Sequence, residues 1–324
     1  MKRPGILLVI AGLIWAVFWW KNPLPPAPKP TPVALHPEKE DSGQEHPSAL
    51  LATRPTSEPT EGAARPTPPP VKKPSSPSHR RHHNRLPPQA SPRRPSQPPA
   101  GAVPYELKNG LAVAYGDVIL GRPKSPDLPR SGFMQAPVVS PWQSSEIAFS
   151  IDPALPNPDR VLQALEYFNT YTPIRFVPFT GQSEGIHFTP TSEHCLSYLG
   201  QIGGHQPIYL SAGCREREIL HEILHALGFM HEHSRPDRDQ YIAVEWEKIQ
   251  EDKWTQFEII PDSWASAVRR RPFDYRSVMM YAETSFAKRR GDITLRTLTN
   301  TAIEPTQEGL SREDLDRLFQ VYAR

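Results

Sequence analysis

The stretch HEILHALGFMHEHSRPDRD, residues 221–239, brings four histidines and two glutamates together within nineteen residues. Apolar residues recur with helical spacing between positions 215 and 227, which predicts a helix there. His221 and His225 are four residues apart, so both project from one side of that helix, as two ligands of one zinc ion must. Glu222 lies beside them, where a carboxylate can take a proton from water and later deliver it to a leaving amine.

A catalytic zinc ion needs three protein ligands and an open position. Gly228 stands where the helix has to stop, and a glycine there can adopt the left-handed conformation that reverses the chain. His231 then returns toward His221 and His225. The motif HExxH alone could be a chance pattern on a polar helix, but the complete HExxHxxGxxH predicts a zinc site.

With these residues the sequence resembles the metzincin zinc peptidases and, within them, the astacins. The match continues past the third histidine, against the family pattern HExxHxxGFxHExxRxDRD. The resemblance implies a zinc endopeptidase with one Zn²⁺ per chain. It implies an α+β fold in which two subdomains flank a cleft, with a twisted, mostly parallel but mixed sheet and a zinc-binding helix. It also implies that Glu232 meets the new N-terminus of the mature enzyme.

A second motif, FDYRSVMMY at residues 273–281, resembles the SxMHY turn of this family. The resemblance makes Met279 the methionine of the turn beneath the metal. It makes Tyr281 an additional zinc ligand, whose hydroxyl can also leave the metal and stabilise the oxyanion. The family histidine is replaced here by Met280, which puts any supporting role of that histidine in doubt.

Cys195 and Cys214 are the two cysteines of the chain. They flank a glycine-containing stretch that could turn back on itself, and an exported chain permits a disulfide, which is favoured over two free thiols. Zinc binding by the two cysteines is disfavoured because no CxxC spacing is present. The segment resembles the astacin edge strand and disulfide-closed loop. An exposed edge formed by Leu196, Ser197, Tyr198 and Leu199 would pair with an extended polypeptide substrate. A second family disulfide is missing, because its positions correspond to Pro173 and Ala323.

Upstream, LAVAYGDVILG at residues 111–121 has the pattern of a short strand and a turn. It resembles the astacin prosegment motif FxGD, with Tyr115 in the aromatic position. The resemblance implies that Asp117 occupies the open position of the metal and makes the chain a latent proenzyme. The alternative is a purely structural turn. An activating protease would have to cut between Gly121 and Trp142, and Arg130 suits a trypsin-like enzyme.

Composition divides the chain into a proline-rich part and a foldable part. Of 40 prolines, 23 lie between residues 22 and 104, a segment with few aromatic or β-branched side chains that reads as a disordered linker. Residues 1–104 carry a net charge of +8 and the whole chain carries +2, which leaves −6 for the rest. A nucleic-acid-binding core would show the opposite balance, so that class is excluded.

The N-terminus places Lys2 and Arg3 before an apolar run that ends in Phe18, Trp19 and Trp20. The absence of a small-residue cleavage site and the presence of interfacial tryptophans favour an uncleaved membrane anchor over a cleaved signal peptide. In either case we expect the remainder to be exported. The short anchor and single-domain plan suggest a bacterial envelope protein that is released when it is activated.

The expected organisation is an anchor at residues 1–21, a linker at 22–104, a prosegment at 105–141 and a catalytic domain at 142–324. The expected function is hydrolysis of peptide bonds. An envelope-anchored scaffold with a structural metal site is the alternative, and it predicts a lost base or an incomplete ligand set. A zinc hydrolase that acts on other substrates is a third hypothesis, which the edge-strand resemblance disfavours.

Overall fold

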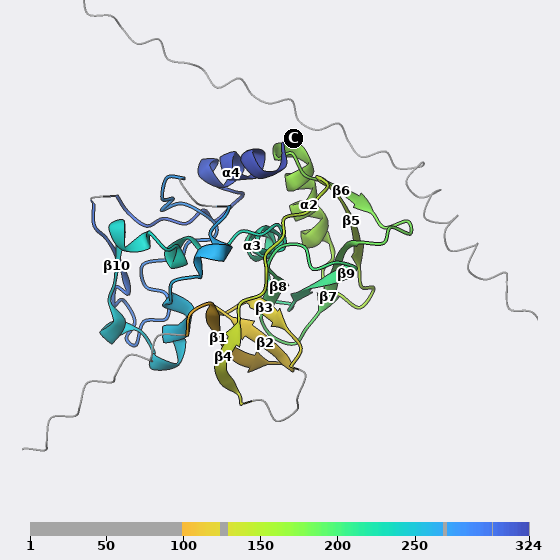
Figure 1. The fold of residues 1–324 in the computed structure, drawn as a ribbon. Helices are drawn as coiled ribbons and strands as arrows, with labels where there is room; N and C mark the ends of the chain where they lie inside the picture. Colours follow the sequence, from red (N-terminus) through yellow and green to blue (C-terminus); the bar gives the residue numbers. More distant parts are fainter. Residues whose placement is uncertain (1–98, 124–128, 268–270, 300, 324) are drawn as a thin grey trace, which may run out of the picture. The chain divides into compact units, whose positions relative to one another are not determined.

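The computed structural model describes residues 99–123, 129–267, 271–299 and 301–323 (Figure 1). The expected anchor and nearly all of the expected linker lie outside these residues. Among the residues that are described, no helix combines the length and the apolar character needed to cross a membrane.

A nine-stranded sheet forms the frame of the described part, in the order β4-β1-β2-β3-β8-β9-β7-β5-β6 (Figure 1). Five strands belong to the expected catalytic domain: β5 (Glu146–Ile151), β6 (Arg175–Pro178), β7 (Gly185–Pro190), β8 (Cys195–Tyr198) and β9 (His205–Leu210). The other four precede them: β1 (Ala102–Lys108), β2 (Leu111–Ala114), β3 (Val118–Gly121) and β4 (Ser131–Gln135). The first strand therefore begins three residues before the boundary expected at residue 105.

The predicted α+β fold with a mixed sheet is confirmed. β5 pairs in parallel with β6 and β7, and β7 pairs in parallel with β9, whereas β8 is antiparallel to β9. Two helices, α2 (Asp159–Tyr171) and α3 (Glu216–Ala226), contact each other and bury their apolar faces in one hydrophobic core with this sheet. The core thus fixes α3, the helix that carries the first two histidines.

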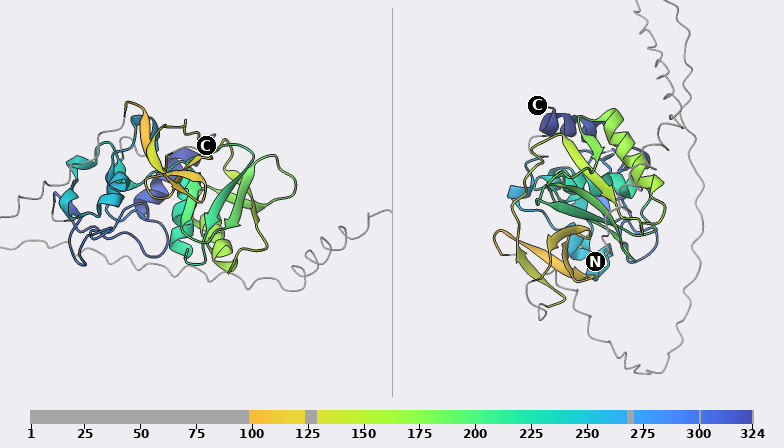
Figure 2. Two further views of the ribbon diagram at one scale, coloured as in Figure 1. Left: turned by 90° about the horizontal axis from the view of Figure 1, so that it is seen from below. Right: turned by 90° about the vertical axis from the view of Figure 1, so that its right-hand side faces the viewer.

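The second half of the catalytic domain is less regular. It consists mainly of short 3-10 helices: η1 (Glu232–Ser234), η2 (Arg238–Gln240), η3 (Trp246–Lys248), η4 (Glu251–Phe257) and η5 (Asp262–Trp264). A two-stranded sheet of β10 (Ile242–Val244) and β11 (Leu295–Thr297) and the helix α4 (Arg312–Tyr322) complete it (Figure 2). This half has a hydrophobic cluster of its own around Trp254 and Phe257.

The C-terminal helix is fastened without a second disulfide. The Tyr322 hydroxyl donates to the carbonyl of Leu227 over 2.7 Å and accepts from the backbone N–H of Trp142 over 3.3 Å. Leu227 follows α3 and Trp142 precedes β5. These hydrogen bonds therefore attach the end of α4 to the core, although the bridge between residues 173 and 323 is missing.

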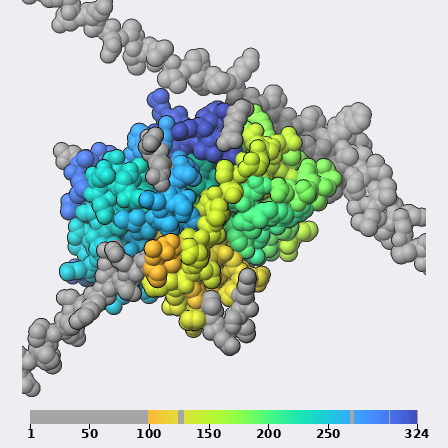
Figure 3. Space-filling model, in the orientation of Figure 1, coloured from red at the N-terminus to blue at the C-terminus, as the bar shows by residue number. Residues whose placement is uncertain are grey.

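The prediction that β8 is an exposed edge strand is wrong for the intact chain. β3 lies alongside β8 in parallel, with Val118 opposite Ser197 and Ile119 opposite Tyr198. Ser197 is fully buried, and Leu199 lies beyond the end of the strand and is also buried. The reason is that the backbone of β3 occupies the hydrogen-bonding edge of β8. The sequence of β8 alone does not reveal this neighbour. In Figure 3 the orange and yellow segments lie between the green strands and the blue C-terminal half.

Candidate active site

The end of α3 is built to turn the chain back on itself. Leu227 is the last residue with helical geometry, and Gly228 follows with a φ of +94°. The N–H of Gly228 donates to the carbonyl of His225 over 2.8 Å, and the N–H of Phe229 donates to that of Leu224 over 2.9 Å. These two bonds form a Schellman motif, in which a left-handed glycine is favoured. His231 is thereby returned to the side of α3 that carries the other two histidines.

The three histidines converge on one point. The Nε2 atom of His231 lies 3.1 Å from Nε2 of His221 and 3.3 Å from Nε2 of His225. The carboxylate of Asp117 completes the group, with oxygens 3.3 to 3.4 Å from all three Nε2 atoms. A tetrahedral zinc ion with ligand bonds of about 2.0 to 2.1 Å requires ligand atoms roughly 3.3 to 3.4 Å apart. The cluster therefore has the dimensions of a site for one metal ion.

Hydrogen bonds on the far side of the rings orient two of these imidazoles. Nδ1 of His221 donates to the carbonyl of Val278 over 3.0 Å, and Nδ1 of His225 donates to that of Phe229 over 2.8 Å. Each Nε2 atom is then left with its lone pair directed at the centre of the cluster. Lone pairs at this separation repel unless a cation lies between them. Burial lowers the pKa of His225 to about 4, which keeps that ring neutral and able to bind a metal.

Glu222 lies next to the cluster, as predicted. Its side chain is almost fully buried, and its Oε2 atom has no hydrogen-bond partner. Burial raises the pKa of Glu222 well above its usual range, and the nearby charge of Asp117 raises it further. A buried carboxylate without a partner is costly, so its retention is typical of a functional group. The carboxyl suits both acceptance and return of a proton.

Asp117 lies in the turn between β2 and β3, which places it opposite the histidines. Burial alone would raise the pKa of Asp117, but the imidazoles of His231 and His225 that face its carboxylate oppose this effect and hold the pKa well below its usual range. The ammonium group of Lys108 fixes this turn by donating to the carbonyl of Gly116 over 2.6 Å. Asp117 therefore lies in one group with His221, His225 and His231 that could hold a metal ion.

Tyr281 and Met279 belong to the FDYRSVMMY motif at residues 273–281. Met279 is 2% exposed and belongs to the main core beneath α3. The hydroxyl of Tyr281 lies 3.2 Å from Oε1 of Gln256 and 3.4 Å from the carbonyl of Tyr115. Met280 is buried in the C-terminal cluster, where it contributes apolar packing in place of an imidazole.

Sequence reasoning missed two residues that contact Tyr281, namely His233 and Gln256. His233 stacks on the ring of Tyr281, with ring centroids 3.8 Å apart, and its Nε2 atom contacts the backbone carbonyl of Gln256 at 3.1 Å. His233 stood in the same motif as the three convergent histidines but outside their spacing. Gln256 lies on η4, where no periodic pattern marks it.

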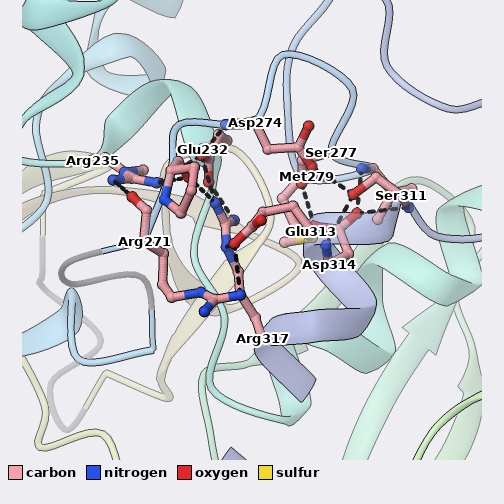
Figure 4. Close-up of polar contacts among 12 residues, drawn as sticks. Glu232, Arg235, Arg271, Asp274, Ser277, Met279, Ser311, Glu313, Asp314 and Arg317 are labelled. Atoms are coloured by element: carbon pink, nitrogen blue, oxygen red, sulfur yellow. Dashed lines mark hydrogen bonds and ion pairs between the residues drawn. The ribbon is translucent and has the colours of Figure 1, made fainter. Parts of the chain in front are cut away.

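Glu232 occupies a buried polar network behind the cluster (Figure 4). Its carboxylate accepts two hydrogen bonds from Arg317, over 2.7 and 2.9 Å, and one from Arg235 over 2.8 Å. The backbone N–H of Asp274 donates to the same carboxylate over 2.7 Å. In the intact chain Glu232 thus has arginine partners, whereas the family resemblance implied an amino terminus.

A cavity of about 360 Å³ opens in front of the cluster. Asp117, His221, Glu222, Gln256 and Tyr281 are among the residues that line it. The predicted disulfide between Cys195 and Cys214 is present, with Cα atoms 6.0 Å apart, and it ties the start of β8 to the chain just before α3. The cleft wall and the zinc helix are therefore linked covalently.

Known proteins share these features. Residues 135–323 match the family model for astacin, which is described as a peptidase family. Zinc metalloproteinase nas-6 of Caenorhabditis elegans is 34% identical over 187 residues, which are 56% of this chain and 54% of that protein. Meprin A subunit alpha of Rattus norvegicus is 33% identical over 219 residues, 66% of this chain and 28% of that protein. The matched regions thus make up little more than half, or less, of these relatives.

A solved structure supports the same assignment. High choriolytic enzyme 1, a hatching enzyme zinc-protease from Oryzias latipes, is 29% identical and has a TM-score of 0.51. The match covers 57% of this chain and 94% of the fish protein. Fold, histidine geometry and family match agree, and the chain belongs to the astacin family of zinc-dependent peptidases.

Proposed function

We propose that this chain is a zinc-dependent endopeptidase that is made as a latent proenzyme. The observation that carries the proposal is the tetrahedral arrangement of three histidine Nε2 atoms and the Asp117 carboxylate beside the unpartnered Glu222. Three histidine ligands and a glutamate base are all present, whereas a scaffold with a structural metal needs no such base.

His221, His225 and His231 would hold the zinc ion, with Tyr281 as an additional ligand. When bound, zinc polarises a carbonyl oxygen and lowers the pKa of a water molecule. Glu222 Oε2 accepts the proton of the attacking water and then delivers it to the nitrogen of the leaving amine. The hydroxyl of Tyr281 donates a hydrogen bond to the former carbonyl oxygen as negative charge develops there.

The proposed substrate is an extended segment of polypeptide. Its main chain would pair with the outer edge of β8, which becomes free once β3 has left. The cavity in front of the cluster would receive the side chain next to the cleaved bond. An edge of backbone N–H and carbonyl groups suits peptides better than other hydrolase substrates, since it recognises the main chain itself.

Latency would depend on the prosegment and on an activating protease. Asp117 contacts all three histidines, β3 covers the edge of β8, and the carbonyl of Tyr115 accepts a hydrogen bond from the Tyr281 hydroxyl over 3.4 Å. Each of these contacts blocks a part of the machinery: the metal position, the substrate edge and the wall around Tyr281. Removal of the segment would expose all of them together.

We also propose that the chain is exported and anchored to a membrane by residues 1–21, with release on activation. The disulfide between Cys195 and Cys214 supports an oxidising compartment. The anchor itself lies outside the described residues and is a proposal from the sequence. A test is fractionation of the expressed full chain, in which the uncleaved form should sediment with membranes and the cleaved form should not.

The experiment that tests the activity compares Glu222→Gln with wild-type protein after removal of the prosegment. A recognition sequence for a highly specific protease, inserted after Val138 in both proteins, gives the same cut in each. The variant should hydrolyse casein about 10² to 10⁴-fold more slowly, which is the usual contribution of a general base, and should still bind one zinc ion. Glu216→Gln, on the first turn of α3, is the matched control. Two zinc-loaded proteins that are equally inactive would favour the scaffold hypothesis.

A further inference from the structure

A buried carboxylate joins the C-terminal helix to the turn beneath the zinc helix. Asp314, on the first turn of α4, is 3% exposed and accepts a hydrogen bond from the Ser277 hydroxyl over 2.7 Å (Figure 4). Its other carboxylate oxygen accepts from the backbone N–H of Val278 over 2.9 Å. One side chain of α4 therefore fixes two consecutive residues of the turn.

The Ser277 hydroxyl carries this connection further into the turn. Its oxygen accepts from the backbone N–H of Met279 over 3.0 Å. A hydroxyl has one proton to donate, and the Met279 N–H can only donate, so the Ser277 proton points at Asp314. The Met279 N–H and the carbonyl of Val278 belong to the same peptide group. That carbonyl accepts from Nδ1 of His221 over 3.0 Å.

These contacts form one continuous chain of hydrogen bonds from His221 to Asp314. Every donor in the chain points away from the imidazole and toward the carboxylate. Hydrogen bonds arranged in this way polarise one another. The carboxylate at the far end therefore strengthens the bond from His221 Nδ1, fixes the orientation of the ring and makes its Nε2 atom a better donor to a metal.

The other two histidines of the cluster are held differently. Nδ1 of His225 donates to the carbonyl of Phe229, and Nδ1 of His231 is buried without a hydrogen-bond partner among the residues that the structure describes. The side chains of both are fully buried, whereas that of His221 is 12% exposed. The imidazole that packing encloses least is thus the one that the hydrogen-bond chain supports.

We propose that Asp314 is a positioning residue, which acts through Ser277 and the peptide group of Val278 to orient His221 and to strengthen zinc binding. Metal-binding histidines commonly donate their second ring N–H to a carboxylate or a backbone carbonyl, and here the two are combined in series. The inference rests on the zinc site of the proposed function and deepens it. It gives the C-terminal helix a part in holding the metal.

The zinc affinity of the uncut full chain tests this role. Competition with a chromophoric chelator should give zinc dissociation constants about 10-fold higher for Asp314→Asn and for Ser277→Ala, the lower end of the 10- to 100-fold effect of partners around a metal site. Because both residues lie in one chain of contacts, the double variant should fall short of the roughly 100-fold product. Ser277→Ala removes only a hydroxyl and serves if the Asp314 variant misfolds.

Ser311→Ala is the matched control. The Ser311 hydroxyl caps α4 by accepting from the backbone N–H of Asp314 over 2.9 Å. Its loss should lower the urea midpoint of unfolding but leaves the chain of hydrogen bonds to His221 intact, so the zinc dissociation constant should not change. Equal weakening of zinc binding in this control would mean that Asp314 only stabilises the helix, which would overturn the proposal.

The Nδ1 proton of His221 gives a readout that does not depend on affinity. In the zinc-loaded protein its NMR resonance should move upfield in Ser277→Ala, because the hydrogen bond to the Val278 carbonyl becomes weaker. The Nδ1 proton of His225, which bonds to a different carbonyl, should not move. An unchanged His221 resonance would overturn the proposal.

The outcomes separate this inference from the proposed function. Full hydrolysis of casein by the cut wild-type protein, with unchanged zinc dissociation constants in both variants, would overturn the role of Asp314 alone. A wild-type protein that binds zinc but does not hydrolyse casein, with the expected losses of zinc affinity in both variants, would support the role of Asp314 and overturn the proposed function.

Discussion

The two sides of the histidine cluster are held in different ways. Behind it, Glu232 is buried between Arg317 and Arg235, and all three belong to the catalytic domain. In front of it, the contacts come from Asp117 and Gly116 in the upstream segment. The contacts behind the site would remain if the proposed prosegment were removed, whereas those in front would be lost together. Stability should therefore depend on the first side and latency on the second.

The largest effect is expected behind the cluster. Arg317→Met removes two of the hydrogen bonds to the buried Glu232 carboxylate and leaves excess negative charge in the interior. Breaking a buried pair in this way costs about 3 to 5 kcal/mol, which urea unfolding would measure. Arg312→Met on the exposed face of the same helix should change stability by less than about 0.5 kcal/mol. Equal effects of the two substitutions would mean that the hydrogen bonds to Glu232 do not contribute to the free energy of unfolding.

In front of the cluster, Asp117→Ala should abolish latency and leave stability nearly unchanged. Loss of the carboxylate that faces the three histidines should raise hydrolysis by the uncut chain roughly 100-fold, which corresponds to about 2.7 kcal/mol of lost interaction between the prosegment and the site. Asp252→Ala, on the exposed side of η4, should keep the chain latent. If the uncut Asp117→Ala protein were as inactive as the uncut wild-type protein while its cut form was active, the inhibitory role of Asp117 would be wrong.

A smaller loss of latency is expected from Gly116→Ala. The left-handed backbone costs an L-residue about 1 to 2 kcal/mol, and the new methyl group would collide with Gln256 Oε1. Hydrolysis by the uncut chain should rise roughly 5- to 30-fold. Gly110→Ala introduces the same backbone strain at a φ of +72° with no atom within 4 Å. A similar rise in that control would assign the effect to strain in the prosegment and not to contact with the cleft.

A cut after Arg130 alone should have almost no effect on activity. β4 lies beyond this bond and pairs with β1 along its whole length, from Ala102 opposite Gln135 to Glu106 opposite Ser131. The prosegment would remain bound to a strand that is still joined to the catalytic domain. A cut within residues 136–141, where Val138 is 89% exposed, should release it. Size-exclusion chromatography of each cut protein would show whether the prosegment peptide co-elutes.

The same division explains what the sequence could predict. His221, His225 and His231 were predictable because their spacing is local, and Gly228 marks the turn between them. Asp117 was identified only through resemblance, since a lone Gly-Asp carries little information. The arginine partners of Glu232 include one that is 85 residues away, and no local pattern indicates such a pairing.

The error about β8 has the same origin. The resemblance that predicts a strand at residues 196–199 does not show what lies beside that strand in the intact chain, and the pairing with β3 joins segments nearly 80 residues apart. Gln256 escaped notice because η4 has no helical or strand periodicity to set it apart. Regular, local elements of the site could thus be predicted, whereas its long-range contacts required the structure.

The most direct test of the account is a time course of casein hydrolysis by the zinc-loaded full chain while the inserted site after Val138 is cut. Activity should rise in proportion to the released prosegment, fall when a chelator removes the zinc and return when zinc is added back. Activity that is already complete before the cut, or that persists without zinc, would contradict a latent zinc peptidase.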